Sequence, residues 1–444
     1  MHILFIHTVI DISSPKFSPP IAVLSAVAKE RGHKTSLLLV KDTLDENEIR
    51  ACVQKTAPDL VAFSATTPQW EVVEQVAKLV KTTVSVPVIC GGIHPTLCPE
   101  EVIASPWIDA ICIGEGEFPL LEYLEAMAGK RPFENIQNLW IKASRLWRRD
   151  RIYRNPMRPA IKDLDILPCW DIDIFDHNNF IQKNSYSILG RPGFFPFTSG
   201  RGCPYRCTYC CNSSLLEIYK GELGHYTRKH SIGYIMKELT ALRSKYDIKG
   251  FEFWDEMLSA DERWIGEFCA RYVAEIGLPY LVLLRVEHAS KKVMEHLRDS
   301  GCFMVAMGVE CGNESFRKDH LNRRMSNQQI IDAFAEARKA GIKTLAWNMI
   351  GMPFETPALI RETIELNRIL RPDILGFAVF HPFPKTKLYD ICKQKGMLSG
   401  RKELLYSDKS VLDQKSISQA ELTECFLEFQ KLAEESNTVA VDWE

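Results

Sequence analysis

Short apolar runs alternate with stretches of helical spacing along the first part of the chain. The runs that predict β-strands cover residues 2–7, 34–40, 59–64, 86–90 and 109–113. Between them, segments such as 20–31 and 70–83 place apolar residues at helical intervals. Strands that are apolar throughout are typical of a parallel sheet with helices on both faces. The pattern predicts a doubly wound, Rossmann-like α/β domain over residues 1–135, with its ligand at the carboxyl ends of the strands.

The same alternation returns in the second half of the chain. Further runs predict strands at 196–200, 250–254, 280–284, 303–309, 343–349 and 374–380. Helical spacing separates them at 230–245, 261–276, 290–300, 326–340 and 356–369. Six strand–helix repeats suit an open barrel better than a small sheet, so we expect a partial (βα)6 TIM-like barrel over 196–395. Functional side chains of such a barrel lie at the carboxyl ends of its strands.

The remaining segments have weaker patterns. Residues 138–153 predict a β-hairpin that closes the first unit, and residues 154–196 contain five prolines and little periodicity. We interpret 136–195 as this hairpin followed by a connector that lies over the surface. Residues 396–444 form a small C-terminal extension with one predicted helix, at 418–436.

Composition narrows the class of protein. The chain has 444 residues, of which 46% are hydrophobic and 25% charged, and its net charge of −2 gives no reason to expect a nucleic-acid partner. The apolar start lacks the basic cluster of a signal peptide, and no apolar run reaches the length of about 18 residues that a membrane span needs. We therefore expect a cytoplasmic protein without a membrane span. In that compartment its fourteen cysteines should be free thiols or metal ligands.

Small residues collect after the strands of the first unit. The segment that follows the first strand, HTVIDISSPKFSPP, contains no glycine, which argues against a dinucleotide site. Instead, Ser64 follows the third strand, Gly91 and Gly92 the fourth, and Gly114 the fifth. Glycine allows the backbone to approach a bulky ligand closely, but it also forms tight turns into helices. Both interpretations remain open from the sequence.

A cluster of cysteines follows the first strand of the predicted barrel. In RGCPYRCTYCCN, Cys203, Cys207 and Cys210 have the spacing C-x3-C-x2-C, and Cys211 follows directly. Zinc is disfavoured, because a structural zinc site closes four positions and no second C-x2-C is present. Three thiolates on a cluster of four irons would leave one iron open to a small molecule. The loop therefore favours a reactive iron–sulfur centre.

These features together resemble the radical S-adenosylmethionine (SAM) enzymes, and within them the cobalamin-dependent branch, over residues 1–395. The motifs that carry the resemblance are SPP at 18–20, GGIHPT at 91–96 with PEE at 99–101, GEGE at 114–117, RGCPYRCTYC at 201–210, FWDE at 253–256, GVECG at 308–312, NMIGMPFET at 348–356 and HPFPKTKLYD at 381–390. The resemblance implies that Cys203, Cys207 and Cys210 hold a 4Fe–4S cluster whose fourth iron binds SAM. It also implies that the first domain binds cobalamin.

The resemblance suggests further SAM contacts at the rim of the barrel. Tyr209 would lie beside the adenine, with core packing as the alternative. Asp255 or Glu256 would accept the amino group of SAM, although relatives carry Gly-Gly-Glu where this chain has Trp-Asp-Glu, and a helix cap is the alternative. Arg285 would bind a carboxylate and Glu310 the ribose or the ammonium group, unless the two pair with each other.

For cobalamin, the expected contacts are Ser64, Gly91, Gly92 and Gly114. The chain lacks the D-x-H-x-x-G run of the family variant that places a histidine on cobalt, so no histidine ligand is expected. His94 is interpreted as a turn residue or as an indirect contact.

The implied activity is methylation of an unactivated carbon of a small-molecule metabolite, through a 5′-deoxyadenosyl radical and methylcobalamin. Flavodoxin or ferredoxin would donate the electrons. Cyclisation or ring rearrangement without methyl transfer is a second hypothesis, and a non-catalytic cobalamin or redox sensor is a third. An RNA methylthiotransferase is disfavoured, because the remaining N-terminal cysteines are scattered singly. Residues that line the barrel or pack within it are Trp347, Asn348, His381 and Tyr389.

Overall fold

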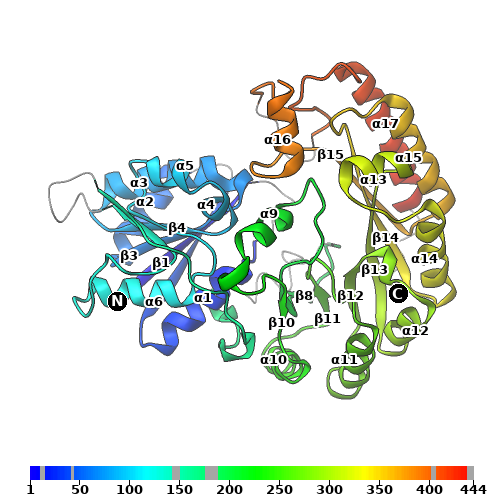
Figure 1. Cartoon of the computed structure of the whole chain (residues 1–444). Helices are drawn as coiled ribbons and strands as arrows, with labels where there is room; N and C mark the ends of the chain where they lie inside the picture. Colours follow the sequence, from blue (N-terminus) through cyan, green and yellow to red (C-terminus); the bar gives the residue numbers. More distant parts are fainter. Residues whose placement is uncertain (11–15, 42–44, 143–150, 176–188, 402–406, 438–444) are drawn as a thin grey trace. The chain divides into compact units, whose positions relative to one another are not determined.

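The structure is a computed structural model, and it describes residues 1–10, 16–41, 45–142, 151–175, 189–401 and 407–437. The chain divides into two compact units (Figure 1). The first comprises Met1–Pro192 together with Glu217–His225, and the second comprises Gly193–Leu216 and Tyr226–Glu444. Residues 136–192 therefore belong to the first unit, which also takes in a short segment from beyond the cysteine loop.

The first unit is built on a seven-stranded sheet in the order β2-β1-β3-β4-β5-β6-β7. Its strands are β1 (His2–Val9), β2 (Lys34–Lys41), β3 (Leu60–Ser64), β4 (Val88–Gly91), β5 (Ala110–Cys112), β6 (Leu139–Lys142) and β7 (Ile152–Arg154). The first five are parallel, and β6 and β7 add the predicted antiparallel hairpin, whose turn lies outside the described residues. Apolar side chains fill both faces of β1, which explains its continuous apolar run.

Helices cover both faces of this sheet, as Figure 1 shows. They are α1 (Pro19–Glu30), α2 (Glu46–Thr56), α3 (Trp70–Thr83), α4 (Ile93–Leu97), α5 (Pro99–Ala104) and α6 (Glu117–Met127), with 3-10 turns at η1 (Thr67–Gln69), η2 (Leu164–Ile166), η3 (Ile172–Ile174) and η4 (Gly221–Leu223). The strand order reverses between β1 and β3. Ligands of doubly wound sheets bind at such a switch point, beyond the carboxyl ends of the strands.

The sequence predicted a connector that lies over the surface, but part of the connector is buried. Its apolar residues Ile161, Leu164 and Leu167 are buried, and they pack with Val23 and Val27 of α1. The prolines prevent long helices in this segment. Burial is still possible, because Leu164 of the short turn η2 and Leu167 directly after it both face α1. The connector therefore completes the core of the first unit.

The second unit is built on six parallel strands in the order β15-β14-β13-β12-β11-β8. The strands are β8 (Phe194–Phe197), β11 (Gly250–Phe253), β12 (Tyr280–Leu284), β13 (Cys302–Glu310), β14 (Lys343–Ile350) and β15 (Ile374–Val379). All six were predicted, and together they form the curled sheet of a partial barrel (Figure 1). A separate two-stranded ribbon joins β9 (Gly200–Arg201) to β10 (Arg228–Lys229).

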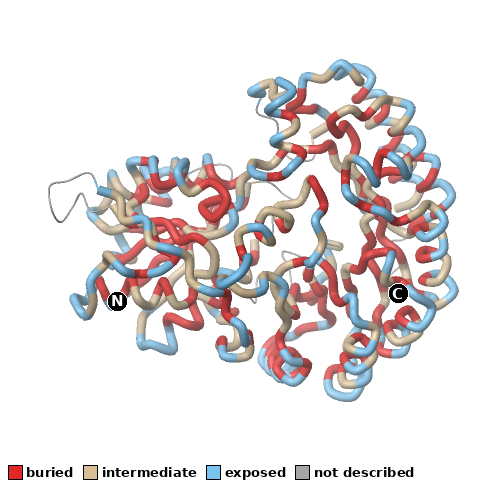
Figure 2. The backbone as a smooth tube through the Cα atoms, in the orientation of Figure 1, coloured by how far each residue is buried: buried red, intermediate tan, exposed pale blue. Residues whose placement is uncertain are grey.

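Helices follow the strands of the second unit along the chain, and Figure 2 shows buried backbone concentrated in the strands. They are α9 (Cys211–Ile218), α10 (Ile232–Lys245), α11 (Glu262–Glu275), α12 (Lys291–Asp299), α13 (Glu314–Leu321), α14 (Asn327–Lys339), α15 (Pro357–Leu370), α16 (Lys387–Gln394) and α17 (Gln419–Asn437), with the 3-10 turn η5 (Val286–His288). The predicted C-terminal helix is α17, where Phe429 stacks on Phe377 of β15 with the ring centroids 4.4 Å apart. Among the described residues, no helix is both long and apolar enough to cross a bilayer.

Two contacts show which strand residues face the helices, and the residues next to them in each strand therefore face the inside of the barrel. Asn367 of α15 donates to Asn348 of β14 over 2.9 Å, so Asn348 faces the helices. Phe253 of β11 packs on Phe268 of α11 in the same way. Successive strand residues point to opposite faces, which places Trp347 and Trp254 on the concave side.

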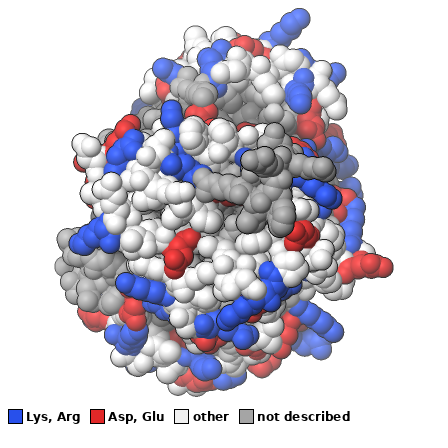
Figure 3. All heavy atoms as spheres, turned by 90° about the vertical axis from the view of Figure 1, so that its left-hand side faces the viewer, with Lys and Arg blue, Asp and Glu red and all other residues white. Residues whose placement is uncertain are grey.

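On the described part of the face drawn in Figure 3, basic and acidic side chains are interspersed, in keeping with the net charge of −2.

Replacing Gly92 by alanine tests the close approach of the strand ends in the first unit. Gly92 has φ +104°, and a Cβ there would lie 2.7 Å from the carbonyl oxygen of Ala65. Gly32 has φ +76° with no atom within 4 Å of such a Cβ, so Gly32→Ala is the matched control for backbone strain. We expect Gly92→Ala to cost about 1–3 kcal/mol more than Gly32→Ala. The melting temperature should fall by about 2–4 °C for each kcal/mol; equal shifts for the two variants would contradict the steric argument.

Candidate active site

The cysteine loop lies between the ribbon strand β9 and helix α9, directly after the first barrel strand. Cys203 and Cys207 are buried, Cys210 is half-buried, and all three are free thiols. The amide of Cys210 donates to the carbonyl of Cys207 over 3.2 Å, which closes a turn between these two residues. The next residue, Cys211, begins α9. The three predicted ligands therefore come from one compact loop at the rim of the barrel.

Hydrogen bonds from distant segments fix the backbone of this loop. The amide and the hydroxyl of Thr208 donate to the carbonyls of Leu321 and His320, over 3.2 and 2.5 Å. The side chain of Asn322 donates to the carbonyl of Arg206 over 2.9 Å. Thr208 also accepts the amide of Leu388 over 3.0 Å. The end of α13 and the start of α16 thus hold the middle of the loop, which orients the sulfur atoms before any ligand binds.

A tyrosine packs tightly against the start of the loop. Gly202 has φ +80°, and a Cβ there would lie 2.7 Å from the ring of Tyr226. The hydroxyl of Tyr226 donates to Asn212 over 2.7 Å, and Asn212 in turn donates to the Sγ of Cys210 over 3.5 Å. The glycine before the first cysteine is therefore required by packing and by backbone conformation.

The surroundings of the sulfur atoms favour the thiolate form of Cys210 and the thiol forms of Cys203 and Cys211 in the absence of a metal. A hydrogen bond from Cys211 lowers the pKa of Cys210 to about 7, and donation from Asn212 adds to this effect. The same hydrogen bond, together with burial, raises the pKa of Cys211, so Cys211 stays a thiol. Burial raises the pKa of Cys203 to about 11. Thiolates bind iron, and the bonds of a cluster go to different irons, so these cysteines fit an iron–sulfur cluster with three protein ligands.

The two adjacent carboxylates at the end of β11 have different environments. Asp255 is buried and accepts the amide of Ser199 over 2.9 Å and its hydroxyl over 2.7 Å. The ammonium group of Lys229 lies 3.7 Å from the same carboxylate. Glu256 is exposed, and it lies close enough to Cys203 to affect the pKa of that thiol. Asp255 therefore ties β11 to the end of β8, whereas Glu256 faces the cysteine loop.

Neither carboxylate serves as a helix cap. The cap of α11 is Asp261, whose side chain accepts the amides of Arg263 and Trp264 over 2.9 and 3.4 Å. The surrounding protein atoms raise the pKa of Glu256, and the like charge of Asp255 adds to this. A ligand cation beside Glu256 would favour its ionised form.

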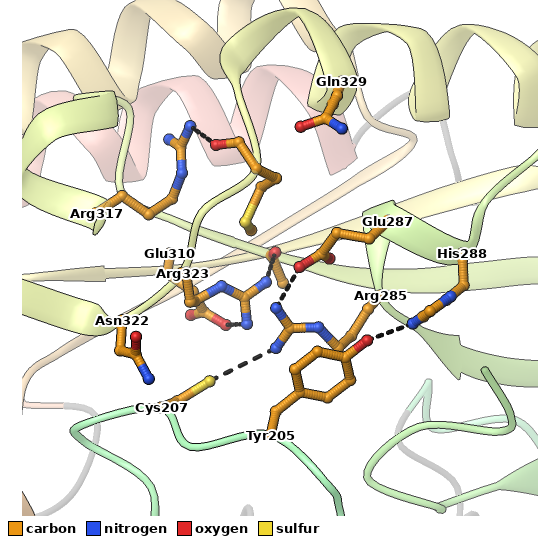
Figure 4. Close-up of polar contacts among 12 residues, drawn as sticks. Tyr205, Cys207, Arg285, Glu287, His288, Glu310, Arg317, Asn322, Arg323 and Gln329 are labelled. Carbon is orange, nitrogen blue, oxygen red and sulfur yellow. Dashed lines mark hydrogen bonds and ion pairs between the residues drawn. The ribbon is translucent and has the colours of Figure 1, made fainter. Parts of the chain in front are cut away.

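Arg285, at the end of β12, makes contacts that the sequence did not indicate (Figure 4). Its Nη1 donates to the Sγ of Cys207 over 3.5 Å, and its Nη2 donates to Glu287 over 2.5 Å. The guanidinium carbon lies 3.7 Å from the centre of the Tyr205 ring. The hydroxyl of Tyr205 bonds to His288. Arg285 thus pairs with Glu287 rather than with Glu310.

Glu310 belongs to a second polar group on the same rim. The hydroxyl of Tyr209 donates to Glu310 over 3.0 Å, and Arg323 lies 3.5 Å from the same oxygen. Arg323 is buried and also donates to the carbonyl of Gly308 over 2.5 Å. Glu310 has φ +68°, and a Cβ at Gly308 would collide with its carboxylate. Tyr209 therefore links the cysteine loop to β13 through its hydroxyl, while its ring contacts the core.

Sequence reasoning missed Glu287, Arg323 and Arg317. Arg317 is fully buried and donates to the carbonyls of Cys311 and Met325, over 2.5 and 2.7 Å. Its role is to fix the chain between β13 and α14. A charge three residues beyond a barrel strand, such as Glu287, is a weak sequence signal of the site. Arg317 and Arg323 carry no such signal, because only the fold buries them.

In the first unit, the predicted small residues lie at the carboxyl ends of neighbouring strands. Ser64 and Gly91 pair in register across β3 and β4. The hydroxyl of Thr96, a residue not singled out from the sequence, donates to the carbonyl of Gly92 over 2.7 Å and accepts the amide of Gly114 over 2.9 Å. The space a Cβ would take at Gly114 is filled by the hydroxyl of Tyr219.

His94 is buried within α4 and is held by its neighbours. Its Nδ1 lies 3.2 Å from the hydroxyl of Thr67, and its ring lies against Trp70 with the centroids 5.4 Å apart. Burial lowers its pKa to about 4, so the ring is neutral at pH 7. These contacts agree with the interpretation of His94 as a structural residue.

Trp347 lies on the concave face of β14 and is 37% exposed. It pairs in register with Gly308 of β13 on one side and Gly376 of β15 on the other. A Cβ at Gly376 would overlap the indole ring, so the ring lies across this glycine. Asn348 is buried toward α15 instead. His381 and Tyr389 are half-buried near the rim.

Comparison with known proteins follows the same division of the chain. Residues 10–124 match the B12 binding domain family, and residues 197–366 match the radical SAM superfamily. A relative from Pyrococcus horikoshii, the uncharacterized methyltransferase PH0819, is 28% identical over 86% of this chain and 80% of its own length. The anaerobic magnesium-protoporphyrin IX monomethyl ester cyclase of Rubrivivax gelatinosus is 26% identical over 88% of this chain and 69% of its own.

Solved structures show the same fold. The radical SAM methyltransferase TsrM from Kitasatospora setae, solved with tryptophan substrate and a SAM analogue, aligns with a TM-score of 0.69 at 16% identity. The alignment covers 90% of this chain and 77% of TsrM. The cobalamin-dependent SAM radical enzyme OxsB, with aqua-cobalamin and SAM bound, aligns with a TM-score of 0.64 at 15% identity. That alignment covers 89% of this chain and 55% of OxsB.

The neighbouring residues Asp255 and Glu256 offer a matched test of the site. Asp255→Ala leaves the buried amide and hydroxyl of Ser199 without their acceptor and removes the carboxylate beside Lys229, which should cost about 3–5 kcal/mol. Glu256→Ala removes an exposed side chain and should change stability by about 0.5 kcal/mol or less. Denaturant unfolding of the metal-free protein, followed by circular dichroism, measures both. Similar destabilisation by the two variants would show that Asp255 does not hold the strands together.

Proposed function

Because the chain belongs to the cobalamin-dependent radical SAM enzymes, we propose that it methylates an unactivated carbon of a small-molecule metabolite. Membership confirms the fold predicted from the sequence and the expected cofactors, which are cobalamin, a 4Fe–4S cluster and SAM. The single observation that carries the proposal is a cysteine loop offering three ligands at a barrel rim, in the same chain as a B12-binding domain. Hydrogen abstraction and methyl transfer need these two parts together.

Each group of residues then has a defined task. Cys203, Cys207 and Cys210 would hold the cluster, and their C-x3-C-x2-C spacing within one loop supports this assignment. When bound and reduced, the cluster supplies the electron that breaks a carbon–sulfur bond of SAM, and cobalamin carries the methyl group. Glu256 would accept the ammonium group of SAM, since it is exposed beside the loop whereas Asp255 is already occupied.

The concave face of the barrel suits radical chemistry. Alternation along the strands places Leu283, Leu345 and Met349 on the same side as Trp347. Apolar side chains exclude water from a reactive radical. The hydroxyls of the two tyrosines in the loop, Tyr205 and Tyr209, are engaged with His288 and Glu310.

In the first unit, Ser64, Gly91 and Gly92 would contact cobalamin through backbone and hydroxyl groups. They lie at the carboxyl edge of the sheet, next to the switch point between β1 and β3. Gly114 would contribute through its backbone, because Tyr219 occupies its side-chain position. No histidine is proposed on cobalt, and the burial of His94 against Trp70 supports this view.

Methylation is preferred over cyclisation because methyltransferases predominate among the named relatives. These include PH0819 and two further methyltransferases, from Streptomyces wedmorensis and Chlorobaculum tepidum. Cyclisation without methyl transfer remains the second candidate, favoured by the 26% identity to the cyclase. We also infer a cytoplasmic location and a low-potential electron donor such as flavodoxin or ferredoxin, because the cluster must be reduced and all fourteen cysteines are free.

The products distinguish these functions. Transfer of one methyl group consumes two SAM molecules and two electrons, and gives S-adenosylhomocysteine from one SAM and methionine with 5′-deoxyadenosine from the other. The reconstituted enzyme, with reductant, methyl-deuterated SAM and a metabolite extract, should yield a product that carries the deuterated methyl group. Formation of 5′-deoxyadenosine with an unlabelled product would indicate cyclisation. Absence of 5′-deoxyadenosine would overturn the proposal and favour a sensor.

Substitution of the four cysteines tests the ligand set. Cys203→Ala, Cys207→Ala and Cys210→Ala should each lose most of the bound iron after anaerobic reconstitution. Cys211→Ala is the matched control and should keep it, because Cys211 begins α9 and donates to Cys210. Iron and sulfide analysis together with electron paramagnetic resonance measure the outcome. Loss of the cluster from Cys211→Ala would assign a fourth protein ligand and contradict an open iron.

Substitution of Glu256 tests its role toward SAM. A charged hydrogen bond contributes about 1.5–3 kcal/mol, so Glu256→Gln should weaken SAM binding by roughly tenfold or more. Glu262→Gln alters another partly exposed carboxylate, which pairs with Lys292, and should leave SAM affinity unchanged. Equilibrium dialysis of SAM against cluster-loaded protein measures both. Equal affinities for the two variants would remove Glu256 from the SAM site.

A further inference from the structure

The environment of Cys207 differs from that of the other two cluster cysteines. Arg285 is only 7% exposed, and its Nη1 lies 3.5 Å from the Cys207 sulfur, within the hydrogen-bond range for sulfur. Cys210 accepts instead from neutral groups, the amide of Asn212 at the same distance and the thiol of Cys211. One of the three sulfurs therefore has a buried cation beside it.

The orientation of Arg285 is fixed on three sides. Glu287 accepts from Nη2 over 2.5 Å, and the ring of Tyr205 lies 3.7 Å from the guanidinium carbon. Tyr205 is held in turn by its hydroxyl, which bonds to His288 (Figure 4). We call these four residues, Tyr205, Arg285, Glu287 and His288, the arginine clamp. Both terminal nitrogens of Arg285 have protein partners, so the guanidinium does not present a free fork to a carboxylate of SAM.

A cation that donates to a ligating sulfur affects the cluster electrostatically. Reduction adds one electron, from a low-potential one-electron donor, and the cluster becomes more negative by one charge without making or breaking a bond. A nearby positive charge stabilises this more negative state, and hydrogen bonds to the sulfurs act in the same direction. Burial strengthens the effect, because solvent does not screen the interaction.

We propose that Arg285 is a positioning residue that raises the reduction potential of the cluster through Cys207, and that Glu287 partly offsets this effect. The clamp then sets how readily the electron donor reduces the cluster. This inference rests on the cluster being held by Cys207, as in the proposed function, but it does not depend on methyl transfer. The expectation that Arg285 anchors a SAM carboxylate is replaced by a role toward the cluster.

The test is a redox titration of the full-length, cluster-loaded protein without SAM or substrate. Dithionite and redox mediators set the potential, and the electron paramagnetic resonance signal of the reduced cluster reports the midpoint. Arg285→Gln should shift the midpoint to more negative values. Arg285→Lys should give a smaller shift, because it keeps the charge but loses the fixed fork. Glu287→Gln should shift the midpoint in the opposite direction, because it leaves the charge of Arg285 unopposed.

The matched control is Arg298→Gln, which removes a half-exposed arginine paired with Asp299 on α12 and should leave the midpoint unchanged. An Arg285→Gln midpoint equal to that of Arg298→Gln would overturn the proposal. Shifts of the same sign in Arg285→Gln and Glu287→Gln would also overturn it, because structural damage does not reverse with charge. If Arg285→Gln binds no cluster, Glu287→Gln alone decides. A Glu287→Gln midpoint that is not more positive than that of Arg298→Gln would then overturn the proposal. These potentials are independent of whether the enzyme methylates its substrate.

Discussion

Two buried guanidinium groups hold the cysteine loop against the strand ends of the barrel. Arg285 contacts Cys207, and Arg323 donates to the hydroxyl of Tyr209 over 3.3 Å. Burying a charge is costly unless it is paired, and each arginine has a carboxylate partner, Glu287 or Glu310. Together with the backbone hydrogen bonds of Thr208, these two ion pairs fix the place of the loop that contains Cys203, Cys207 and Cys210.

The same rim separates residues that are adjacent in the chain. Asp255 is buried between β8 and β11, while Glu256 is exposed toward the loop. Successive residues at a strand end point to opposite sides, so two neighbouring carboxylates lie in different environments. In β14, alternation divides Asn348, which bonds to Asn367, from Trp347 on the concave face in the same way.

The first unit relies on close packing at its strand ends. Gly92 allows the backbone to approach Ala65, and Thr96 joins the segments of Gly92 and Gly114 by hydrogen bonds. Such an edge offers backbone groups to a large neutral surface. The barrel rim carries buried arginines that are paired with carboxylates. The two units thus prepare different chemistry at equivalent edges of parallel sheets.

The sequence by itself determined the two α/β units, the strands of the barrel and the spacing of the cysteine ligands, because apolar periodicity and local motifs are properties of short segments. Only the tertiary structure decided that Arg285 pairs with Glu287, that Arg323 joins Tyr209 to Glu310, and that the connector is buried against α1. Tyr209 and Glu310 are 101 residues apart in the chain. Side-chain pairing between residues so far apart in the chain depends on which strands become neighbours. The apolar pattern of a single strand does not determine which strands are its neighbours.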